Sequence, residues 1–306
     1  MGVKPRGRRK QFARRLKMLR IRSRLTLEEV AVPMRFSTSK LQRVEAGENL
    51  IDVHALKSLL DIYGVTADRW QEYFDLLDDA REPGWWRSYG LDDRGYVPLE
   101  ADASLVSEFC LAHLPALLQT AEYTAANFRA GPNRLRGEPL HKAVTVRMIR
   151  QKRLTSAEDP LRLVTIIDES ALYRVTGSPA VMAAQLARLI EAAALDTVTL
   201  HVLPAVAGTH LTQIGSFSLL SFDDLDEPDV AYVEHQLGSV HSERESIVTA
   251  ARLRFDRLRS EALSPEESVA VLRSAAERYA GSARSEPSRG PQRRPVAQEQ
   301  LQHRQR

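Results

Sequence analysis

Helix start and stop signals divide residues 10–81 into short amphipathic segments, and this pattern constrains the fold more than any other feature of the chain. A first helix is predicted from residue 10, because three apolar residues recur at i, i+4 and i+7 on one face: Phe12, Leu16 and Leu19. Thr26 and Glu29 form the capping-box pattern that starts a second helix. Pro33 should end that helix, because proline lacks the amide hydrogen and its ring clashes one turn back.

Three further short helices are predicted in the same region. Ser37 can cap a third helix that stops at Gly47, and Asp52 can cap a fourth. The fifth carries an apolar stripe at i, i+3, i+4 and i+7, formed by Trp70, Tyr73, Phe74 and Leu77. Five short helices in succession predict an all-α five-helix domain over residues 10–81.

The third helix lies in the segment RFSTSKLQRVEAG, residues 35–47, and has two faces. Its apolar anchors are Phe36, Leu41 and Val44, and its polar side chains are Thr38, Ser39, Lys40, Gln42 and Arg43. A recognition helix in the DNA major groove needs both faces, because polar residues near its N-terminal end meet base edges while apolar residues hold it to the bundle. An ordinary solvated helix has a similar composition, so the surrounding chain decides between the two interpretations.

The charge distribution favours a recognition helix. Residues 1–63 carry fifteen Lys and Arg against six Asp and Glu, a balance of +9, whereas the whole chain is +3 and the remainder therefore −6. Residues 1–9 are predicted to be a basic flexible arm, and the cations around it should contact phosphates without reading sequence: Arg6, Arg8, Arg9 and Lys10. Arg43 can pair with guanine O6 and N7, whereas Lys40 could contact either a base or a phosphate.

Residues 10–64 resemble the phage-repressor or xenobiotic-response-element type of helix-turn-helix (HTH) regulator. The residues that carry the resemblance are Leu16, Leu19, Leu25 to Ala31, Ser37, Leu41, Arg43 to Glu45, and Gly47. The resemblance implies that Thr38, Ser39 and Arg43 contact bases and that Arg20 pairs with Glu45. Two positions depart from the family pattern: Arg35 replaces the usual glycine of the turn, and Pro33 is unusual within the second helix.

The second part of the chain, residues 82–280, is predicted to be an α+β domain with a small mixed sheet. The helical pattern breaks at the sequence REPGWW, residues 81–86, which places the boundary near residue 82. Expected strands cover residues 161–168, 197–204, 215–222 and 229–236, and expected helices cover residues 98–110, 115–130, 139–155, 179–194, 241–262 and 265–280. Residues 281–306 have almost no apolar side chains and are predicted to be a disordered tail.

Residues 85–279 resemble the C-terminal domain of streptomycete developmental and antitoxin-like regulators, a large actinobacterial family. The matching blocks are Gly84 to Trp86, Tyr96 to Glu100, Leu114 to Thr120 with Tyr123, Arg147 to Arg153, Asp168 to Leu172, Gln185 and Leu186, Thr199 to Pro204 with Gly208, Gly215 to Phe217, and Val233 and Glu234. Ala116 replaces the glycine that is usual in one block. The resemblance implies a regulator whose gene often neighbours that of a small partner protein.

Enzymatic and metal sites are not expected. The zinc-peptidase motif His-Glu-x-x-His is missing from the sequence, and the spacing of four histidines fits no standard zinc pattern: His201, His210, His235 and His241. Ser170 and Ser216 lie in no Gly-x-Ser-x-Gly elbow. The single cysteine, Cys110, excludes an intramolecular disulfide and a cysteine-based zinc cluster. We expect no enzyme activity, no metal and no cofactor.

Three acidic or aromatic features have alternative interpretations. The acidic residues between positions 223 and 229 lack the glycine and distal glutamate of an EF-hand, which favours a solvated turn. Asp168 and Glu169 follow a strand, where catalytic carboxylates occur, but acids also favour helix N-termini. Trp85 and Trp86 could line a ligand pocket or fill the space between domains.

These features together predict a cytoplasmic, sequence-specific transcription regulator that binds double-stranded DNA as a homodimer, without membrane association. Its C-terminal domain would dimerise and sense a small protein partner or a ligand. Two alternatives remain open: an antitoxin-like protein that sequesters a small partner and autoregulates its operon, and an enzyme with a DNA-binding arm.

Overall fold

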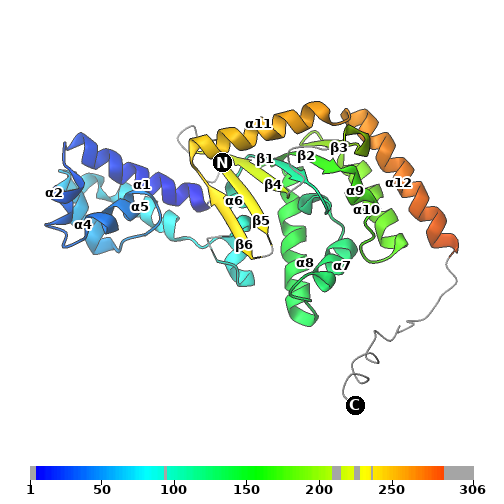
Figure 1. Ribbon diagram of the computed structural model, residues 1–306. Helices are drawn as coiled ribbons and strands as arrows, with labels where there is room; N and C mark the ends of the chain where they lie inside the picture. The colour runs from blue at the N-terminus through cyan, green and yellow to red at the C-terminus, as the bar shows by residue number, and fades with distance from the viewer. Residues whose placement is uncertain (1–4, 93–94, 209–214, 224–227, 236, 286–306) are drawn as a thin grey trace, which may run out of the picture.

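The computed structural model describes residues 5–285 except 93–94, 209–214, 224–227 and 236. A helical N-terminal part lies beside a larger part in which helices surround one sheet (Figure 1). Both the all-α domain and the α+β domain predicted from the sequence are confirmed.

The N-terminal part consists of five α-helices, as predicted. They are α1 (Pro5–Arg22), α2 (Leu27–Ala31), α3 (Thr38–Glu45), α4 (Val53–Ile62) and α5 (Trp70–Arg81), with one turn of 3₁₀-helix, η1 (Ala67–Arg69), before the last. Their apolar stripes meet in one core whose fully buried members include Phe12, Leu16, Leu41, Leu56 and Leu77. The predicted caps are present. The side-chain oxygens of Thr26, Ser37 and Asp52 accept hydrogen bonds from backbone amides at the starts of α2, α3 and α4.

The prediction of a flexible arm over residues 1–9 is wrong for residues 5–9, which form the first turns of α1. Proline suits the first position of a helix, because its fixed φ is helical and its missing amide would have no partner there. The end of α5 also holds this segment: Arg8 pairs with Glu82, and Arg9 donates to the carbonyl of Ala80 at 3.2 Å. Residues 1–4 lie outside the described residues.

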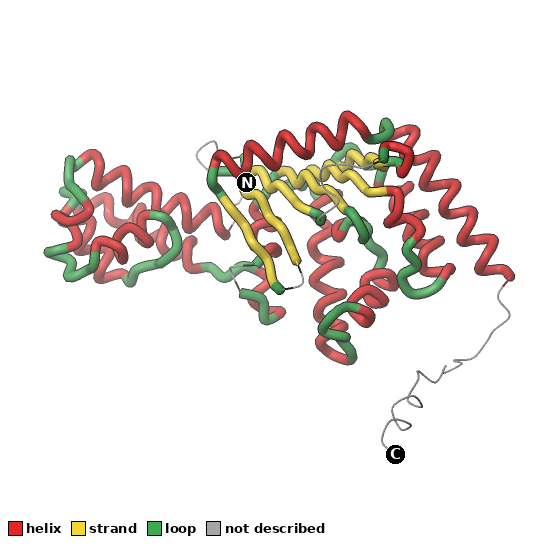
Figure 2. The backbone as a smooth tube through the Cα atoms, in the orientation of Figure 1, coloured by secondary structure: helices red, strands yellow, loops and turns green. Residues whose placement is uncertain are grey.

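The second part is built on a six-stranded mixed sheet, whose strands are yellow in Figure 2. Its strands are β1 (Leu105–Cys110), β2 (Arg162–Asp168), β3 (Val198–Leu203), β4 (Phe217–Ser221), β5 (Val230–His235) and β6 (Gly238–Ser242), in the order β3-β2-β1-β4-β5-β6. Strands β1 to β3 are parallel, whereas β4, β5 and β6 pair antiparallel.

Two of these strands differ from the prediction. Residues 105–110 were expected to be helical, but they form β1 at the centre of the sheet. The misleading signal is Glu108, a charged residue that lies buried within the strand. Residues 238–242 form the edge strand β6, whose short polar sequence GSVHS has no apolar alternation, and the helix expected from residue 241 begins at Glu245.

In the described ranges of the second part, seven α-helices accompany the sheet. They are α6 (Tyr96–Asp102), α7 (Ala121–Ala130), α8 (Gly137–Gln151), α9 (Glu169–Tyr173), α10 (Pro179–Ala192), α11 (Glu245–Glu261) and α12 (Pro265–Ser285). Short 3₁₀ turns lie between them: η2 (Trp85–Tyr89), η3 (Ala116–Leu118), η4 (Lys152–Thr155) and η5 (Ala205–Ala207). Helix α12 continues to Ser285, so the prediction of a disordered tail is wrong for residues 281–285, and residues 286–306 lie outside the described residues.

Each face of the sheet has its own core. Phe109, Ile166 and Leu219 face α11 and pack with Phe255. Val106, Leu163 and Ile167 face the other way and pack with residues of α10 and α12, including Leu186, Leu189 and Leu272. The central strands are therefore covered on both sides, whereas every residue of β6 is at least partly exposed.

Candidate nucleic-acid interface

Helix α3 separates its polar and apolar residues cleanly. Leu41 and Val44 are buried in the helical core, at 0% and 1% exposure. Five polar side chains of the same helix are exposed: Thr38, Ser39, Lys40, Gln42 and Arg43. Ser37 precedes them and accepts the amide of Lys40 at 3.1 Å, which fixes the start of the helix.

The turn between α2 and α3 explains both departures from the family pattern. Arg35 has φ +53°, in the left-handed region where glycine is strained least. The amide of Phe36 then donates to the carbonyl of Ala31 at 2.9 Å and closes the turn. Pro33 lies beyond Ala31, the last residue of α2, so it ends the helix without interrupting it.

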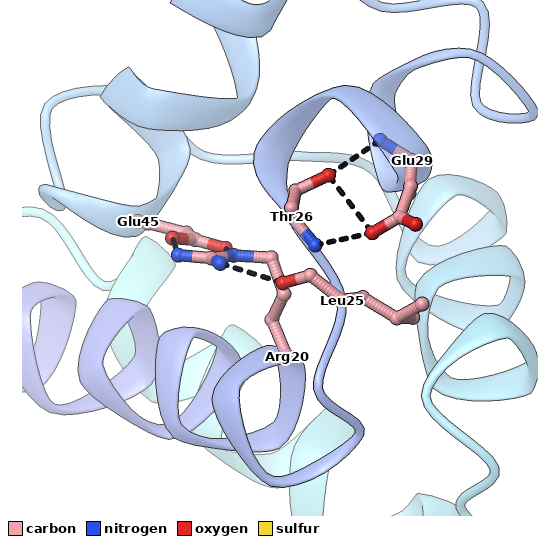
Figure 3. Close-up of polar contacts among 5 residues, drawn as sticks. All are labelled: Arg20, Leu25, Thr26, Glu29 and Glu45. Carbon is pink, nitrogen blue, oxygen red and sulfur yellow. Dashed lines mark hydrogen bonds and ion pairs between the residues drawn. The ribbon is translucent and has the colours of Figure 1, made fainter.

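A bidentate ion pair ties α1 to the last residue of α3 (Figure 3). Nε and Nη2 of Arg20 donate to Oε1 and Oε2 of Glu45 at 2.7 and 2.9 Å, and Nη1 donates to the carbonyl of Leu25 at 2.8 Å. The hydrogen bond with Glu45 raises the pKa of Arg20 above its ordinary value. The predicted pairing is confirmed, and it sets the position of α3 relative to α1.

The exposed residues of α3 differ in their surroundings. Nζ of Lys40 lies 3.6 Å from the centre of the Phe36 ring, a cation–π contact that keeps the ammonium beside the start of the helix. Ser39, Gln42 and Arg43 line a shallow depression of about 460 Å³ together with Ala46 and Glu48. A depression lined by an amide, a hydroxyl and a guanidinium offers hydrogen-bonding groups to an edge of a base.

Arg43 also lines a larger cleft between the two parts of the chain. This cleft has a volume of about 1250 Å³. Its walls include Arg9 and Glu48 of the helical part, Trp86 of η2, and Arg244 before α11. Trp86 is 2% exposed, so most of its side chain fills space between the domains. It also lines the cleft, so both interpretations offered for Trp86 in the sequence describe part of its position.

The basic residues near the N-terminus are not all placed as expected. Arg8 and Arg9 contact the end of α5, as described above, so they lie on a folded helix and not on a free arm. The side chains of Arg6 and Lys10 lie outside the described part of the structure.

Other residues singled out in the sequence have structural contacts. His201 lies 2.9 Å from the Leu263 carbonyl through Nδ1. Asp168 caps α9 by accepting the amide of Ser170, and Glu169 accepts the amide of Ala205. His235 accepts the amide of Leu237, and His241 lines the interdomain cleft. His210 and residues 224–227 of the acidic loop lie outside the described residues.

In the described ranges, His, Cys, Asp and Glu side chains form no group of three or more that could hold a metal ion. The helices that the structure describes include none that is long and apolar enough to span a membrane.

The sequence interpretation missed a buried polar cluster in the α+β part. Its centre is the ion pair of Arg150 with Glu100, in which Nε and Nη2 each donate to a carboxylate oxygen at 2.6 Å. Glu108 of β1 and Arg147 of α8 lie close enough to interact electrostatically with this pair. The arginine-rich block 147–153 was a signal for the cluster, but the helix predicted over residues 98–110 hid Glu108.

Comparison with known protein families agrees with this architecture. Residues 11–72 match a family described as "Helix-turn-helix domain", and the exposed face of α3 lies within that range. The N-terminal part is therefore a helix-turn-helix module of the DNA-binding class. Residues 93–274, more than half of the chain, match the family described as "Domain of unknown function (DUF5753)", and the protein belongs to that family. Comparisons with curated proteins and with solved structures gave no match.

Proposed function

We propose that this protein is a sequence-specific, DNA-binding transcription regulator of the cytoplasm and not an enzyme. The observation that carries the proposal is the exposed face of α3. Thr38, Ser39 and Arg43 project from a helix whose opposite side is buried and whose ends are fixed by Ser37 and by the Arg20–Glu45 pair. This is the arrangement a recognition helix needs, because base contacts require side chains held in one orientation.

Arg43 is the residue we assign to base recognition, with Thr38, Ser39 and Gln42 beside it. A guanidinium can engage O6 and N7 of guanine together, whereas a lysine offers a single point of contact. Lys40, held over Phe36, is assigned to a phosphate. Arg9 shares the cleft with Arg43 and is assigned to the DNA backbone next to the groove.

Substitution of Arg43 tests the assignment. The operator is first selected from random DNA with the full-length protein. Arg43→Ala should then weaken binding to that operator by about 1–3 kcal/mol and relax the base preference at one position. Arg69→Ala serves as the control. Arg69 is an exposed arginine of η1 that pairs with Glu72 of α5, so this variant should bind like the wild type.

Fluorescence anisotropy at a fixed salt concentration measures both variants on the operator and on unrelated DNA. An equal loss on both DNAs would show that Arg43 contacts a phosphate and would contradict its role as a base reader. If selection enriches no sequence at all, the proposal of sequence-specific binding fails.

We further propose that the protein acts as a homodimer on a two-fold site, with half-sites about 34 Å apart. The α+β domain would provide the dimer contact and sense a small protein partner or a ligand. Analytical ultracentrifugation with and without the operator tests the dimer, and a single monomer bound per operator would contradict it.

Sequestration of a small partner protein, as in an antitoxin, is a second candidate. It is favoured by exposed apolar residues on the β5–β6 hairpin: Val233 at 40%, Val240 at 60% and Leu237 at 93% exposure. Val233 and Val240 are directly paired across the hairpin, so they share a face. Co-purification with the product of the neighbouring gene, lost in Val240→Ser, would support this role, and absence of a complex at micromolar concentration would contradict it.

A further inference from the structure

A row of polar residues crosses the sheet beneath α6 and α8. Glu108 of β1 is paired with Thr165 of β2 on one side and with Ser218 of β4 on the other. Ser218 is in turn paired with Tyr232 of β5. Directly paired residues point to the same face of a sheet, so these four side chains lie side by side within an otherwise apolar surface.

Residues of α6 and α8 complete the cluster above this row. The ring of Tyr96 meets that of Tyr232 edge to face, with centroids 4.8 Å apart. Arg150 lies 5.4 Å from the Tyr96 ring and makes its bidentate pair with Glu100. Arg150 and Glu100 therefore satisfy each other, and they leave two ionisable groups of the cluster without such a partner.

The first of these groups is Glu108. Its side chain is 8% exposed, and its Oε1 atom has no hydrogen-bond partner among the described residues. Burial, and next the negative charge of Glu100, raise the pKa of Glu108 to about 7. Burial disfavours the charged form of this carboxyl and outweighs the opposite effects of Thr165, Arg150 and Arg147, so near neutral pH Glu108 can carry a proton to donate.

The second group is Arg147, one turn before Arg150 on α8. In the part of the chain that the structure describes, it forms no ion pair with a carboxylate. Its Nη1 donates to Oε1 of Gln119 at 3.3 Å, and its guanidinium lies 5.3 Å from the Phe128 ring. Burial lowers the pKa of Arg147 to about 10, with a further lowering by Arg150. The charges of Glu100, Glu234 and Glu108 act on Arg147, but its direct contacts in the described residues are a neutral amide and a ring. A partly buried guanidinium without a direct ion pair is a site for an anion.

We propose that this polar cluster is a binding site for a small carboxylate ligand, with Arg147 pairing to the carboxylate and the carboxyl group of Glu108 donating a hydrogen bond to it. The planar fork of arginine matches a carboxylate. Tyr96 and Tyr232 provide aromatic walls for the organic part of the ligand. Arg147 is only partly buried and interacts electrostatically with Glu234, whose side chain is exposed, so the solvent side of the site is at Arg147.

The binding has a specific pH dependence. The charged and titratable groups around Glu108 are Glu100 and Tyr96 of α6, Arg147 and Arg150 of α8, and Cys110 of β1, and Glu108 is the group among them whose pKa lies near 7. Burial, and next the charge of Arg147, lower the pKa of His113 below its ordinary value, so this histidine loses its charge at lower pH than Glu108 does. A carboxylate that accepts a hydrogen bond from Glu108 binds its protonated form, so the affinity falls as the pH rises through 7. Binding should be about tenfold weaker at pH 8 than at pH 6.

The full-length protein is titrated with benzoate by calorimetry, without DNA, at pH 6 and pH 8. Benzoate stays fully ionised over this range, so a change in affinity reports on the protein. We expect saturable binding that weakens about tenfold between the two pH values. Sodium sulfate at equal ionic strength is the control for screening and should give no saturable binding.

Three variants separate the roles of the residues. Arg147→Gln should abolish benzoate binding, whereas Lys142→Gln, which removes an exposed lysine of the same helix, should leave it unchanged. Glu108→Gln keeps a hydrogen-bond donor without the titration, so it should bind with the same affinity at both pH values. Circular dichroism verifies that each variant is folded, and Arg147→Lys, which keeps the positive charge, should retain part of the binding.

The proposal is overturned if benzoate does not bind, if sulfate gives the same response, or if binding persists in Arg147→Gln. It is also overturned if the pH dependence persists in Glu108→Gln. The site would serve the ligand-sensing role proposed above. Because binding is measured without DNA, its failure is distinguishable from a failure of DNA recognition.

Discussion

At the scale of single residues, paired and unpaired charges have different consequences in this protein. Glu45 and Arg20 are both largely buried, with side chains 5% and 13% exposed, and each satisfies the other. Glu108 is equally buried and has no such partner for its Oε1 among the described residues. The first arrangement fixes helix α3, and the second leaves a titratable group inside the α+β domain.

Removal of Glu45 should be strongly destabilising. Glu45→Ala leaves the guanidinium of Arg20 buried without a counter-ion, which should lower the free energy of unfolding of the N-terminal domain by roughly 3 kcal/mol. A double-mutant cycle with Arg20→Met, followed by urea denaturation, isolates the coupling between the two side chains. The exposed pair of Arg69 and Glu72 is the matched control and should couple by less than about 1 kcal/mol. Equal coupling in the two pairs would contradict the role assigned to the buried one.

Glu108 should make stability depend on pH in the direction opposite to an ordinary carboxylate. Its pKa is raised from 4.5 to about 7 in the folded protein, so the folded state binds an additional proton between these values. The stabilisation is therefore complete below the unfolded pKa and is lost as the pH rises through 7. The free-energy difference is on the order of 3 kcal/mol.

Urea denaturation of wild type and Glu108→Gln at pH 5 and pH 8 measures this effect. The unfolding free energy of the wild type should fall relative to that of the variant as the pH rises. Glu122→Gln, which changes an exposed glutamate of α7, should run parallel to the wild type. Parallel behaviour of Glu108→Gln would show that the folded protein does not raise the pKa of Glu108.

At the scale of secondary-structure elements, the turn between α2 and α3 determines the orientation of α3. The capping box of Thr26 and Glu29 starts α2, and Pro33 follows its end. Arg35 then bends the chain in the left-handed conformation, and Ser37 starts α3. Every step of this turn is encoded locally except at Arg35, where a side chain occupies a conformation that glycine adopts more easily.

Replacement of Arg35 by glycine should stabilise the N-terminal domain by roughly 1 kcal/mol, because it removes the steric strain of a side chain at φ +53°. Arg22→Gly is the control, because Arg22 is the last helical residue of α1 and glycine should not stabilise it there. Thermal unfolding followed by circular dichroism compares the two variants. A lower melting temperature for Arg35→Gly would mean that contacts of the arginine side chain outweigh the strain.

At the scale of the whole molecule, the two domains have separate cores. The core of the N-terminal domain extends from Phe12 to Ala80, whereas both cores of the α+β domain begin after residue 98. Described contacts between the domains include the packing of α1 against α6 and the residues that line the interdomain cleft. Damage to one core should therefore leave the other largely intact.

Leu56→Ala tests this independence. Leu56 is fully buried in the helical core, so its truncation should destabilise the N-terminal domain by about 2–5 kcal/mol. Hydrogen exchange measured by mass spectrometry should show faster exchange in α1 to α5 and unchanged exchange in β1 to β3. Loss of protection throughout both domains would show that they unfold as one unit.

The helical domain and the two faces of α3 could be predicted from the sequence because their determinants are local. Caps such as Ser37 and Asp52 act within one turn, and apolar spacing places Leu41 and Val44 on one face of a single helix. The strands β2 to β5 were predicted for the same reason, from runs of β-branched and apolar residues. The base-reading roles of Thr38, Ser39 and Arg43 remain predictions.

The tertiary structure decided the features that depend on partners distant in the chain. A sequence containing Ser107 and Glu108 does not indicate a central strand, and β1 forms because β2 and β4 hydrogen-bond to both of its edges. The polar cluster likewise joins residues from α6, β1 and α8, so no window of sequence contains it. Local free-energy preferences therefore determined the helices and their caps, whereas long-range pairing and burial determined the centre of the sheet and the charge environment of Glu108.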